Sequence, residues 1–484
     1  MTTLKSPAAL IVLRPLLITG LLLLGNRASA VAQLPQVRSP NQRPPLAGHW
    51  TGRMVHDSAS LPVSFDFDVD MKGVWHGSFT SLTQRALEYP LDTVRLTATD
   101  LHLVLGDGAD VFTGRVSGDS IVGVLRDTDS GEGRFFLYRA ATPQYPYRRE
   151  DVTIRNAGVS VAGSLYIPAR PGRHPAIIIL QGSGPETRWG TARYLADRFA
   201  RRGVAALITD KRGTGESTGD WRTATFNDLA DDAIASVRFL AERSDIDPHK
   251  IGFFGHSQGT MIAALGTAKT KVNEVAFVVA GEPLGDSVYK QDIWRVGRIM
   301  QDAQASGMHT ADQVAHAMRI YRQFVDVARS GGLGYDAFKR AADSVSNQHW
   351  FQMLDIPPRD SWVWNWYRPV GNFNPAPYWE QVRVPVMLLY AERDELVPVA
   401  KSLHDVERAL ERGGNTVYTV VMIPDAMHNW SIHPAPNAPF FWWHQAPGIN
   451  DLVVAWVVQQ TSGVTRPADV FPRTNAGAAA IPRR

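Results

Sequence analysis

The stretch Ile251–Ala268, IGFFGHSQGTMIAALGTA, passes directly from an apolar, strand-like run to a helix-forming run. Residues 255–259 between them read GHSQG, which fits the pattern Gly-x-Ser-x-Gly. A serine hydroxyl attacks a substrate only where it stands clear of the backbone, and a tight strand-to-helix turn presents it in that way. Because glycines two residues before and after keep the helix from colliding with the strand, the pattern predicts that Ser257 is a nucleophile.

A second match to this pattern, GESTG at residues 215–219, lies in the polar stretch DKRGTGESTGDW of residues 210–221. No strand-like run comes directly before Ser217, and no helix-forming run comes directly after it. An ordinary helix N-cap would explain the serine at position 257 but not its two glycines. We therefore interpret Ser217 as a turn residue and Ser257 as the nucleophile.

Apolar runs typical of buried strands recur on both sides of this stretch. They are HPAIIIL at 174–180, VAALIT at 204–209, VAFVVA at 275–280 and VPVMLLY at 384–390. Helix-forming stretches such as Asp228–Glu242 alternate with them. This alternation is typical of a mainly parallel sheet covered by helices. The sequence therefore predicts an α/β domain with a first part at 142–284 and a second part at 381–461.

The stretch between these parts, residues 285–380, consists of helical segments that interrupt the alternation. It holds six of the chain's fourteen tryptophans, namely Trp294, Trp350, Trp362, Trp364, Trp366 and Trp379. We expect a helical cap over the sheet, in which some of these rings pack the cap and others line an apolar substrate pocket.

A different pattern precedes residue 142. Apolar residues alternate with polar ones, as in Val63, Phe65 and Phe67, and turn pairs such as Asp107-Gly108 separate the runs. Alternation with period two is typical of antiparallel strands that bury one face. The sequence predicts a small antiparallel β-domain over residues 48–141, a barrel or a sandwich, without catalytic residues.

A nucleophilic serine needs a base within hydrogen-bond reach and a carboxylate that orients the base. In a sheet of this kind the acid follows the serine along the chain, and the histidine comes last. Asp394 lies directly after the run VPVMLLY, between Glu392 and Glu395, and is our candidate acid. Glu282, directly after VAFVVA, is the alternative.

The candidate base is His428, in the loop after the last strand-like run, TVYTVVMI at 416–423. From this loop an imidazole would face Ser257. His433 is the alternative, five residues further on. His256 lies within the serine turn itself, and we expect its side chain to pack against neighbouring residues.

Oxyanion stabilisation requires donors, and two backbone amides are the usual supply. One should be the N–H of Gln258, which directly follows the nucleophile. The other should come from the loop QGSGP at 181–185, after HPAIIIL, where either Ser183 or Gly182 is the donor. Small residues there would let the backbone approach the substrate.

Taken together, the strings QGSGPETR, DKRGTGEST, GHSQG, AERDELVP and DAMH resemble those of exported bacterial α/β-hydrolases of the esterase and serine-aminopeptidase-like type, which are related to dienelactone hydrolases. The likeness covers roughly residues 48–460. It implies the α/β-hydrolase fold with a small β-domain first and a helical cap before the acid. Many relatives of the wider fold carry His at the start of the oxyanion loop, where this chain has Gln181. Since oxyanion donors are backbone amides, this difference alters the pocket without removing the chemistry.

The amino-terminal residues have the features of a secretory signal peptide over 1–30. Lys5 and Arg14 precede or flank the apolar run Leu16–Leu24, and small residues end at Ala30, near which we expect cleavage. The alternative, a membrane anchor, would need a longer apolar run to cross about 30 Å. Residues 31–47 should form a proline-rich linker, and residues 462–484 a disordered tail.

Composition excludes several classes of function. The chain has 484 residues, a formal charge of +3 and no Cys, so it offers neither a Cys nucleophile nor thiolate metal sites. Loss of Lys5, Arg14 and Arg27 with the signal peptide leaves 47 basic against 47 acidic residues, so nucleic acid is not an expected partner. We expect no cofactor, no metal and no stable membrane anchor, and the oligomeric state stays open.

The sequence therefore predicts an exported serine hydrolase, a carboxylesterase that acts on a small-molecule ester. Thioesterase or lactonase activity and aminopeptidase or amidase activity are alternatives, and a non-catalytic lipid- or glycan-binding protein is a remote one. An aminopeptidase would need a carboxylate for the substrate amine, and Glu186, Glu282 and Glu380 are the candidates. Arg188 would either bind an anionic group of the substrate or form a structural ion pair.

Overall fold

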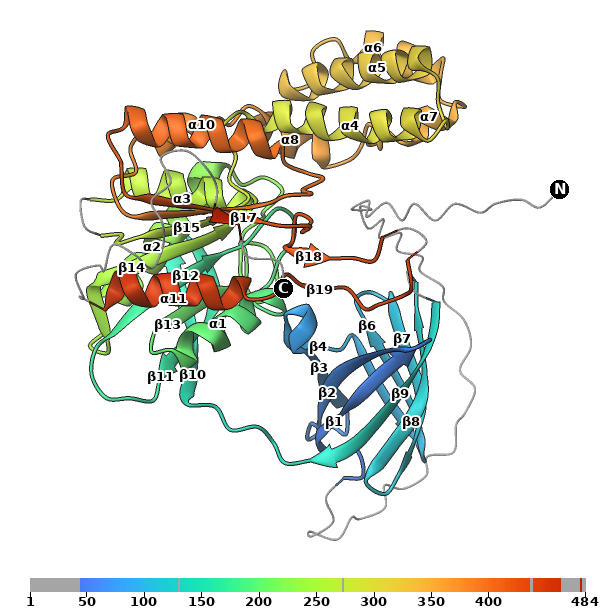
Figure 1. The fold of residues 1–484 in the computed structure, drawn as a ribbon, viewed down its shortest axis with the longest axis vertical. Helices are drawn as coiled ribbons and strands as arrows, with labels where there is room; N and C mark the ends of the chain where they lie inside the picture. The colour runs from blue at the N-terminus through green and yellow to red at the C-terminus, as the bar shows by residue number, and fades with distance from the viewer. Residues whose placement is uncertain (1–43, 129–130, 272–273, 436–437, 463–478, 481–484) are drawn as a thin grey trace, which may run out of the picture. The chain divides into compact units, whose positions relative to one another are not determined.

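The computed structural model describes residues 44–128, 131–271, 274–435, 438–462 and 479–480 (Figure 1). The expected signal peptide and most of the expected linker and tail lie outside these residues. The chain forms two compact units. The first comprises Met1–Ser78 and Pro90–Thr142, and the second comprises Phe79–Tyr89 and Pro143–Arg484.

The first unit is built on an antiparallel sheet with the strand order β4-β3-β2-β1-β9-β8-β7-β6-β5. In chain order the strands are β1 (Gly48–His56), β2 (Ala59–Val69), β3 (Trp75–Ser81), β4 (Ala86–Pro90), β5 (Thr93–Thr97), β6 (Asp100–Leu105), β7 (Asp110–Ser117), β8 (Ser120–Asp127) and β9 (Gly131–Ala140). The end of β3, from Phe79, and all of β4 except Pro90 belong to the second unit.

This sheet curls on itself. The adjacent residues Leu91 and Asp92 donate backbone hydrogen bonds to Gly77 O in β3 and to Val104 O in β6, both at 2.9 Å. The interior is aromatic: the fully buried Phe112 ring lies 5.4 Å from Phe65 and is edge-on to it. These residues are the apolar positions of the period-two pattern, which is why that pattern predicted a β-domain.

The second unit is built on a mainly parallel sheet with the order β10-β11-β13-β12-β14-β15-β16-β17-β20. Its strands are β10 (Tyr147–Asn156), β11 (Val159–Pro168), β12 (His174–Leu180), β13 (Ala205–Thr209), β14 (Ile246–His256), β15 (Val278–Gly281), β16 (Val386–Ala391), β17 (Tyr418–Ile423) and β20 (Ala479–Ala480). β10, β11 and β13 pair antiparallel, and the pairs from β12 onwards are parallel. β20 lies in the tail that the sequence predicted to be disordered.

Helices cover both faces of this sheet (Figure 1). α1 (Thr191–Arg201) and α11 (Ile449–Thr461) pack on one face, and α2 (Phe226–Ala241), α3 (Gln258–Lys269) and α10 (Val399–Arg412) pack on the other. Alternate residues of β12 point to the two faces, as Ile177 and Ile178 show. The fold is an α/β-hydrolase fold, as the sequence predicted.

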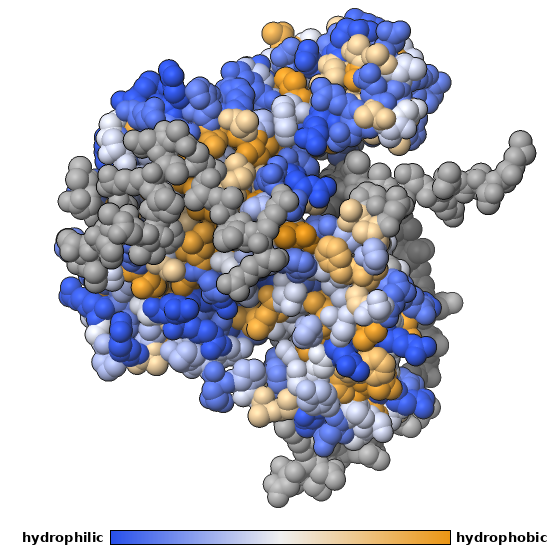
Figure 2. Space-filling view, viewed as in Figure 1, coloured by the Kyte–Doolittle hydropathy of each residue, from blue (hydrophilic) through white to orange (hydrophobic). Residues whose placement is uncertain are grey.

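The cap lies between β15 and β16. It consists of α4 (Val288–Ala305), α5 (Ala311–Arg329), α6 (Tyr335–Asp343), α7 (His349–Gln352) and α8 (Val363–Gly371), and α9 (Ala376–Trp379) leads back to the sheet. The cap has a core of its own, in which Trp350 and Trp364 are buried. Figure 2 shows a mostly hydrophilic surface on the visible face of the cap helices.

Two observations go beyond the predicted organisation. The expected β-domain is not one continuous segment, because Phe79–Tyr89 belongs to the second unit. This segment contains the 3-10 helix η1 (Leu82–Gln84), and its Leu87 joins the core beside α1 and α11. In addition, none of the helices in the described ranges combines the length and apolarity needed to cross a membrane.

Candidate active site

Ser257 stands at the tight turn between the end of β14 and the start of α3. Its φ is 53° and its ψ is −119°, a combination that non-glycine residues rarely adopt and that costs on the order of 1–3 kcal/mol. Both flanking glycines are required: a Cβ at Gly255 would lie 2.3 Å from Gly259 O, and a Cβ at Gly259 would lie 2.4 Å from Leu180 O. The serine is therefore presented on a strained turn, as the pattern predicted.

Asp394 and His428 come together from the loops after two neighbouring strands, β16 and β17. His428 Nδ1 lies 2.8 Å from Asp394 Oδ2, and both side chains are buried. The turn with Ser257 is adjacent to them, since His256 Nε2 lies 3.0 Å from His428 O. Of the predicted side chains, the structure thus pairs the acid with the base and places the serine turn beside the base loop.

The second oxygen of Asp394 is held by the backbone. Asp394 Oδ1 accepts hydrogen bonds from the amides of Leu396 (2.7 Å) and Val397 (2.8 Å). Burial alone would raise the pKa of this carboxyl, but attraction to His428 and the hydrogen bonds outweigh it and lower the pKa. Asp394 therefore stays ionised and can hold a protonated imidazole.

The two acidic neighbours of Asp394 fix the loop that carries the base. Glu395 Oε2 accepts a hydrogen bond from the amide of His428 at 3.1 Å, and Glu392 Oε2 accepts one from the amide of Asp425 at 3.0 Å. The AERDELVP loop thus orients His428 by its side chain and by its backbone.

Glu282, the alternative acid, lies behind the pair. It is fully buried after β15, and its Oε1 accepts hydrogen bonds from Trp430 Nε1 and the amide of Ala391, both at 2.8 Å. Its Oε2 is buried and has no hydrogen-bond partner among the described residues, although the Asp394 carboxylate is close enough to repel it. Burial and repulsion by Asp394 raise the pKa of Glu282 well above its ordinary value, so the protonated carboxyl can donate to Asp394. Glu282 is thus a partner of the acid and makes no hydrogen bond to a histidine in the part of the chain that the structure describes.

The expected oxyanion loop lies next to the serine turn. A Cβ at Gly182 would lie 3.7 Å from Ser257 Cβ. The Gly182 amide, however, donates to Glu186 Oε2 at 3.0 Å, so Glu186 engages one of the two predicted donors in this loop. Ser183 is exposed. Gln258 begins α3, so its amide is one of the helix-initial N–H groups that have no partner within the helix.

Lys211 forms hydrogen bonds to the carbonyls of the oxyanion loop, a role that the sequence did not predict. Its Nζ donates hydrogen bonds to Gly182 O, to Gly184 O (2.8 Å) and to Gln258 Oε1 (3.3 Å). Burial lowers its pKa to about 8, against attraction to Glu186. The available signal was a lysine just past the carboxyl end of β13, beside the predicted loop.

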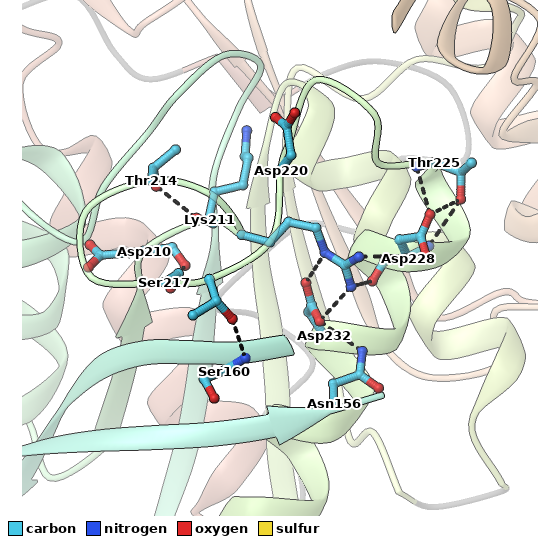
Figure 3. Close-up of polar contacts among 12 residues, drawn as sticks. Asn156, Ser160, Asp210, Lys211, Thr214, Ser217, Asp220, Thr225, Asp228 and Asp232 are labelled. Atoms are coloured by element: carbon cyan, nitrogen blue, oxygen red, sulfur yellow. Dashed lines mark hydrogen bonds and ion pairs between the residues drawn. The ribbon is translucent and has the colours of Figure 1, made fainter. Parts of the chain in front are cut away.

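The second Gly-x-Ser-x-Gly match is structural. Ser217 is buried, donates to Asp210 O (2.8 Å) and accepts from the amide of Ala162 (2.9 Å). Figure 3 shows Ser217 in the 210–219 loop. Arg212 of the same loop forms hydrogen bonds with Asp232 on α2. These contacts account for Ser217 without a role in the reaction.

The other side chains considered above have structural partners. His433 Nε2 lies 2.9 Å from Ser431 Oγ. Arg188 is buried in ion pairs with Glu216 and Asp210, and Glu380 pairs with Arg412. Across the described ranges, no group of three or more His, Cys, Asp or Glu side chains is arranged to hold a metal ion.

Comparisons with known proteins agree with this architecture. Among curated proteins, the polyketide transferase ATR5 of Stachybotrys chlorohalonatus is 32% identical over 143 residues, which are 29% of this chain and 46% of that protein. Esterase EstD of Thermotoga maritima is 24% identical over 138 residues, 27% of this chain and 32% of that protein. The chain thus spans about half the length, or less, of these relatives.

Among solved structures, Est1E from Butyrivibrio proteoclasticus has a TM-score of 0.39 at 17% identity and covers 64% of this chain and 99% of its own. The family described as X-Pro dipeptidyl-peptidase (S15 family) matches residues 157–422, which include Ser257 and Asp394. The resemblance to esterase and aminopeptidase-like α/β-hydrolases that the motifs indicated is confirmed. Because the match covers more than half of the chain, this protein is a serine hydrolase of the α/β type and belongs to the X-Pro dipeptidyl-peptidase (S15) family.

Proposed function

We propose that this hydrolase is exported and cleaves small carboxylic esters through a Ser257–His428–Asp394 triad and an acyl-enzyme. The observation that carries the proposal is the buried 2.8 Å contact of His428 Nδ1 with Asp394 in the loop beside the strained serine turn. Export rests on the amino-terminal sequence, which has the charged start, apolar run and small residues of a cleaved signal.

In the proposed mechanism, His428 Nε2 takes the proton of Ser257 Oγ as the oxygen attacks the ester carbonyl. Asp394 holds the Nδ1–H side and stabilises the imidazolium. The amides of Gln258 and Ser183 donate hydrogen bonds to the developing oxyanion. His428 then protonates the leaving alcohol, and water releases the acyl group by the same steps in reverse order.

The test compares wild-type protein with Ser257→Ala on p-nitrophenyl esters of increasing acyl length. Removal of such a nucleophile lowers kcat on the order of a millionfold. A fluorophosphonate should modify the wild-type protein, and mass spectrometry should place the adduct on Ser257. An adduct on Ser217, or an unchanged rate for Ser257→Ala, would overturn the proposed mechanism.

An aminopeptidase or amidase is the second candidate, because Glu186 places a carboxylate beside the nucleophile. Its Oε1 lies 3.0 Å from the position of a Cβ at Gly182, which would itself be 3.7 Å from Ser257 Cβ. The family description also names a peptidase. The same assay separates the two candidates when it includes aminoacyl anilides with free and acetylated amines. Faster cleavage of the free-amine anilides than of the esters would favour the peptidase.

A further inference from the structure

The segment Phe79–Tyr89 is anchored in the catalytic unit at its carboxyl end. Leu87 packs in the core that α1 and α11 form with the sheet. Glu88 accepts hydrogen bonds from Tyr145 (2.8 Å) and from Arg193 (2.9 Å), a fully buried arginine of α1. These contacts fix the position of the preceding residue pair, Arg85-Ala86, relative to the sheet.

Arg85 reaches from this segment to the loop that carries His428. Its Nη1 donates hydrogen bonds to Asn429 O (3.3 Å) and to Gln445 Oε1 (3.0 Å). Gln445 Nε2 donates to the same Asn429 carbonyl at 2.9 Å. The guanidinium also lies over the Trp430 ring, 5.1 Å from its centre. The two residues that directly follow His428 are therefore both held by Arg85.

Trp430 is held equally firmly from other sides. Its Nε1 donates a hydrogen bond to Glu282 Oε1, and its carbonyl accepts one from the amide of Ala446 at 2.8 Å. Its ring lies edge-on to His256, at 5.7 Å between ring centres. Arg85 thus adds its contacts with Asn429 and Trp430 to those that Glu282, Ala446 and His256 make with the base loop.

An arginine at position 85 lowers the stability of the fold, because its charge is buried. It is 5% exposed, and no carboxylate in the described part of the chain forms an ion pair with it. Its Nε has no hydrogen-bond partner among the described residues. A buried cation without a counter-charge lowers stability, and burial lowers the pKa of Arg85 to about 10. Packing alone would favour an apolar side chain here, so the contacts to the base loop are the gain that accounts for an arginine.

We propose that Arg85 is a positioning residue of the active site, which fixes the backbone of Asn429 and Trp430 and so directs the His428 imidazole toward Ser257. The inference rests on the proposed function, in which His428 is the base. It adds to the catalytic unit a residue that precedes the family match at residues 157–422. A displacement of about 1 Å in a reacting group lowers rates by up to about a hundredfold.

The experiment uses the full chain and measures kcat and KM for p-nitrophenyl butyrate, together with thermal unfolding, for Arg85→Met. The matched control is Arg243→Met, which removes a largely buried arginine of this unit that pairs with Glu150 and Asp245 and contacts neither Glu88 nor the base loop. We expect Arg85→Met to lower kcat about tenfold to a hundredfold with KM within about twofold, and Arg243→Met to lower stability with kcat within about twofold. Assays are run well below both unfolding temperatures.

Gln445→Leu, which removes the second donor to Asn429 O, should lower kcat in the same direction but by less, and it replaces Arg85→Met if that variant does not fold. A kcat for Arg85→Met, or for Gln445→Leu in its place, no lower than that for Arg243→Met would overturn the inference. Ser257→Ala is measured beside them. If Ser257→Ala keeps full activity the proposed function fails, whereas an inactive Ser257→Ala with an unaffected Arg85→Met overturns only the role of Arg85.

Discussion

Glu282 Oε2 is buried near the carboxylate of Asp394 and has no hydrogen-bond partner among the described residues. A single proton on one of the two carboxyl groups supplies the missing donor. The pKa of Asp394 is lowered and that of Glu282 is raised, so the proton belongs to Glu282. Glu282 therefore donates to Asp394 while it accepts hydrogen bonds from Trp430 and Ala391. A neutral acid in this place orients the ionised acid without repelling it.

Glu282→Gln should keep kcat within about threefold of wild type, because an amide also donates to Asp394 and accepts from Trp430. Glu282→Ala should lower the free energy of unfolding by about 2–4 kcal/mol, since it leaves buried donors unpaired. Both variants are measured by denaturant unfolding and by ester turnover. Equal loss of activity in Glu282→Gln and Glu282→Ala would show that the ionised form of Glu282 is the active one.

The difference in stability between the wild-type protein and Glu282→Gln should depend on pH. The raised pKa means that folded wild-type protein binds more protons than the unfolded chain above the ordinary glutamate pKa of 4.5, so its stability decreases as pH rises from there to the folded pKa. Glu282→Gln has no titratable group at this position, so its stability lacks this dependence on pH. Its stability relative to wild type should therefore increase with pH, by up to about 1.4 kcal/mol per pH unit. A constant difference would contradict the assignment.

Among the elements, the 210–219 loop contains residues that anchor it to the sheet and one residue that contacts the oxyanion loop. Ser217 and Arg212 tie it to β11 and α2, and Lys211 projects from it to the oxyanion loop. This loop thus places the Lys211 ammonium within hydrogen-bond distance of the Gly182 and Gly184 carbonyls.

Lys211→Met should lower kcat about tenfold to a hundredfold with a smaller effect on KM, because a displaced oxyanion donor costs about 3 kcal/mol when it is lost entirely. Lys269→Met, which removes a surface ion pair with Asp231, is the control and should leave kcat unchanged. The folded pKa of about 8 lies below 10.5, so the stability of wild type relative to Lys211→Met should rise with pH between these values. An unchanged kcat for Lys211→Met would mean that the loop holds its shape without this cation.

Elements with a local pattern could be predicted from the sequence. The apolar runs are the parallel strands, and the serine turn and the loops with Asp394 and His428 each follow one of these runs. Because the carboxyl ends of parallel strands meet at one edge of the sheet, the order of the runs predicts that these residues lie together. The tryptophans of the cap were harder, since an aromatic ring looks alike in a core and in a pocket; Trp350 and Trp364 pack inside the cap. Arg85 could not be found, because its hydrogen bond to Asn429 joins residues 344 positions apart.

For the whole molecule, the chain enters the catalytic unit at Phe79, leaves it after Tyr89 and re-enters it at Pro143. The sequence predicted a single boundary near residue 142, because strand patterns continue through residues 79–89 without a break. The contacts of Leu87 and Glu88, not the local pattern, assign this segment to the catalytic unit.

A chain that begins at Pro143 should therefore have a less stable catalytic unit than the full protein. It lacks Glu88, which leaves the buried Arg193 without its carboxylate, and loss of one partner of a buried pair costs about 3–5 kcal/mol. Differential scanning calorimetry of the two proteins, with a chain that begins at residue 44 as the control, measures the difference. An unchanged transition for the chain from Pro143 would show that the segment adds nothing to stability.

The repeated passage of the chain between its units also restricts how such a gene can recombine. A single crossover near residue 142 would join a foreign amino-terminal unit to this catalytic unit and would replace Arg85 and Glu88 with whatever the donor carries at those places. Only donors that bring a compatible segment would give a working chimera. The two units are therefore expected to be inherited together, although each has a core of its own.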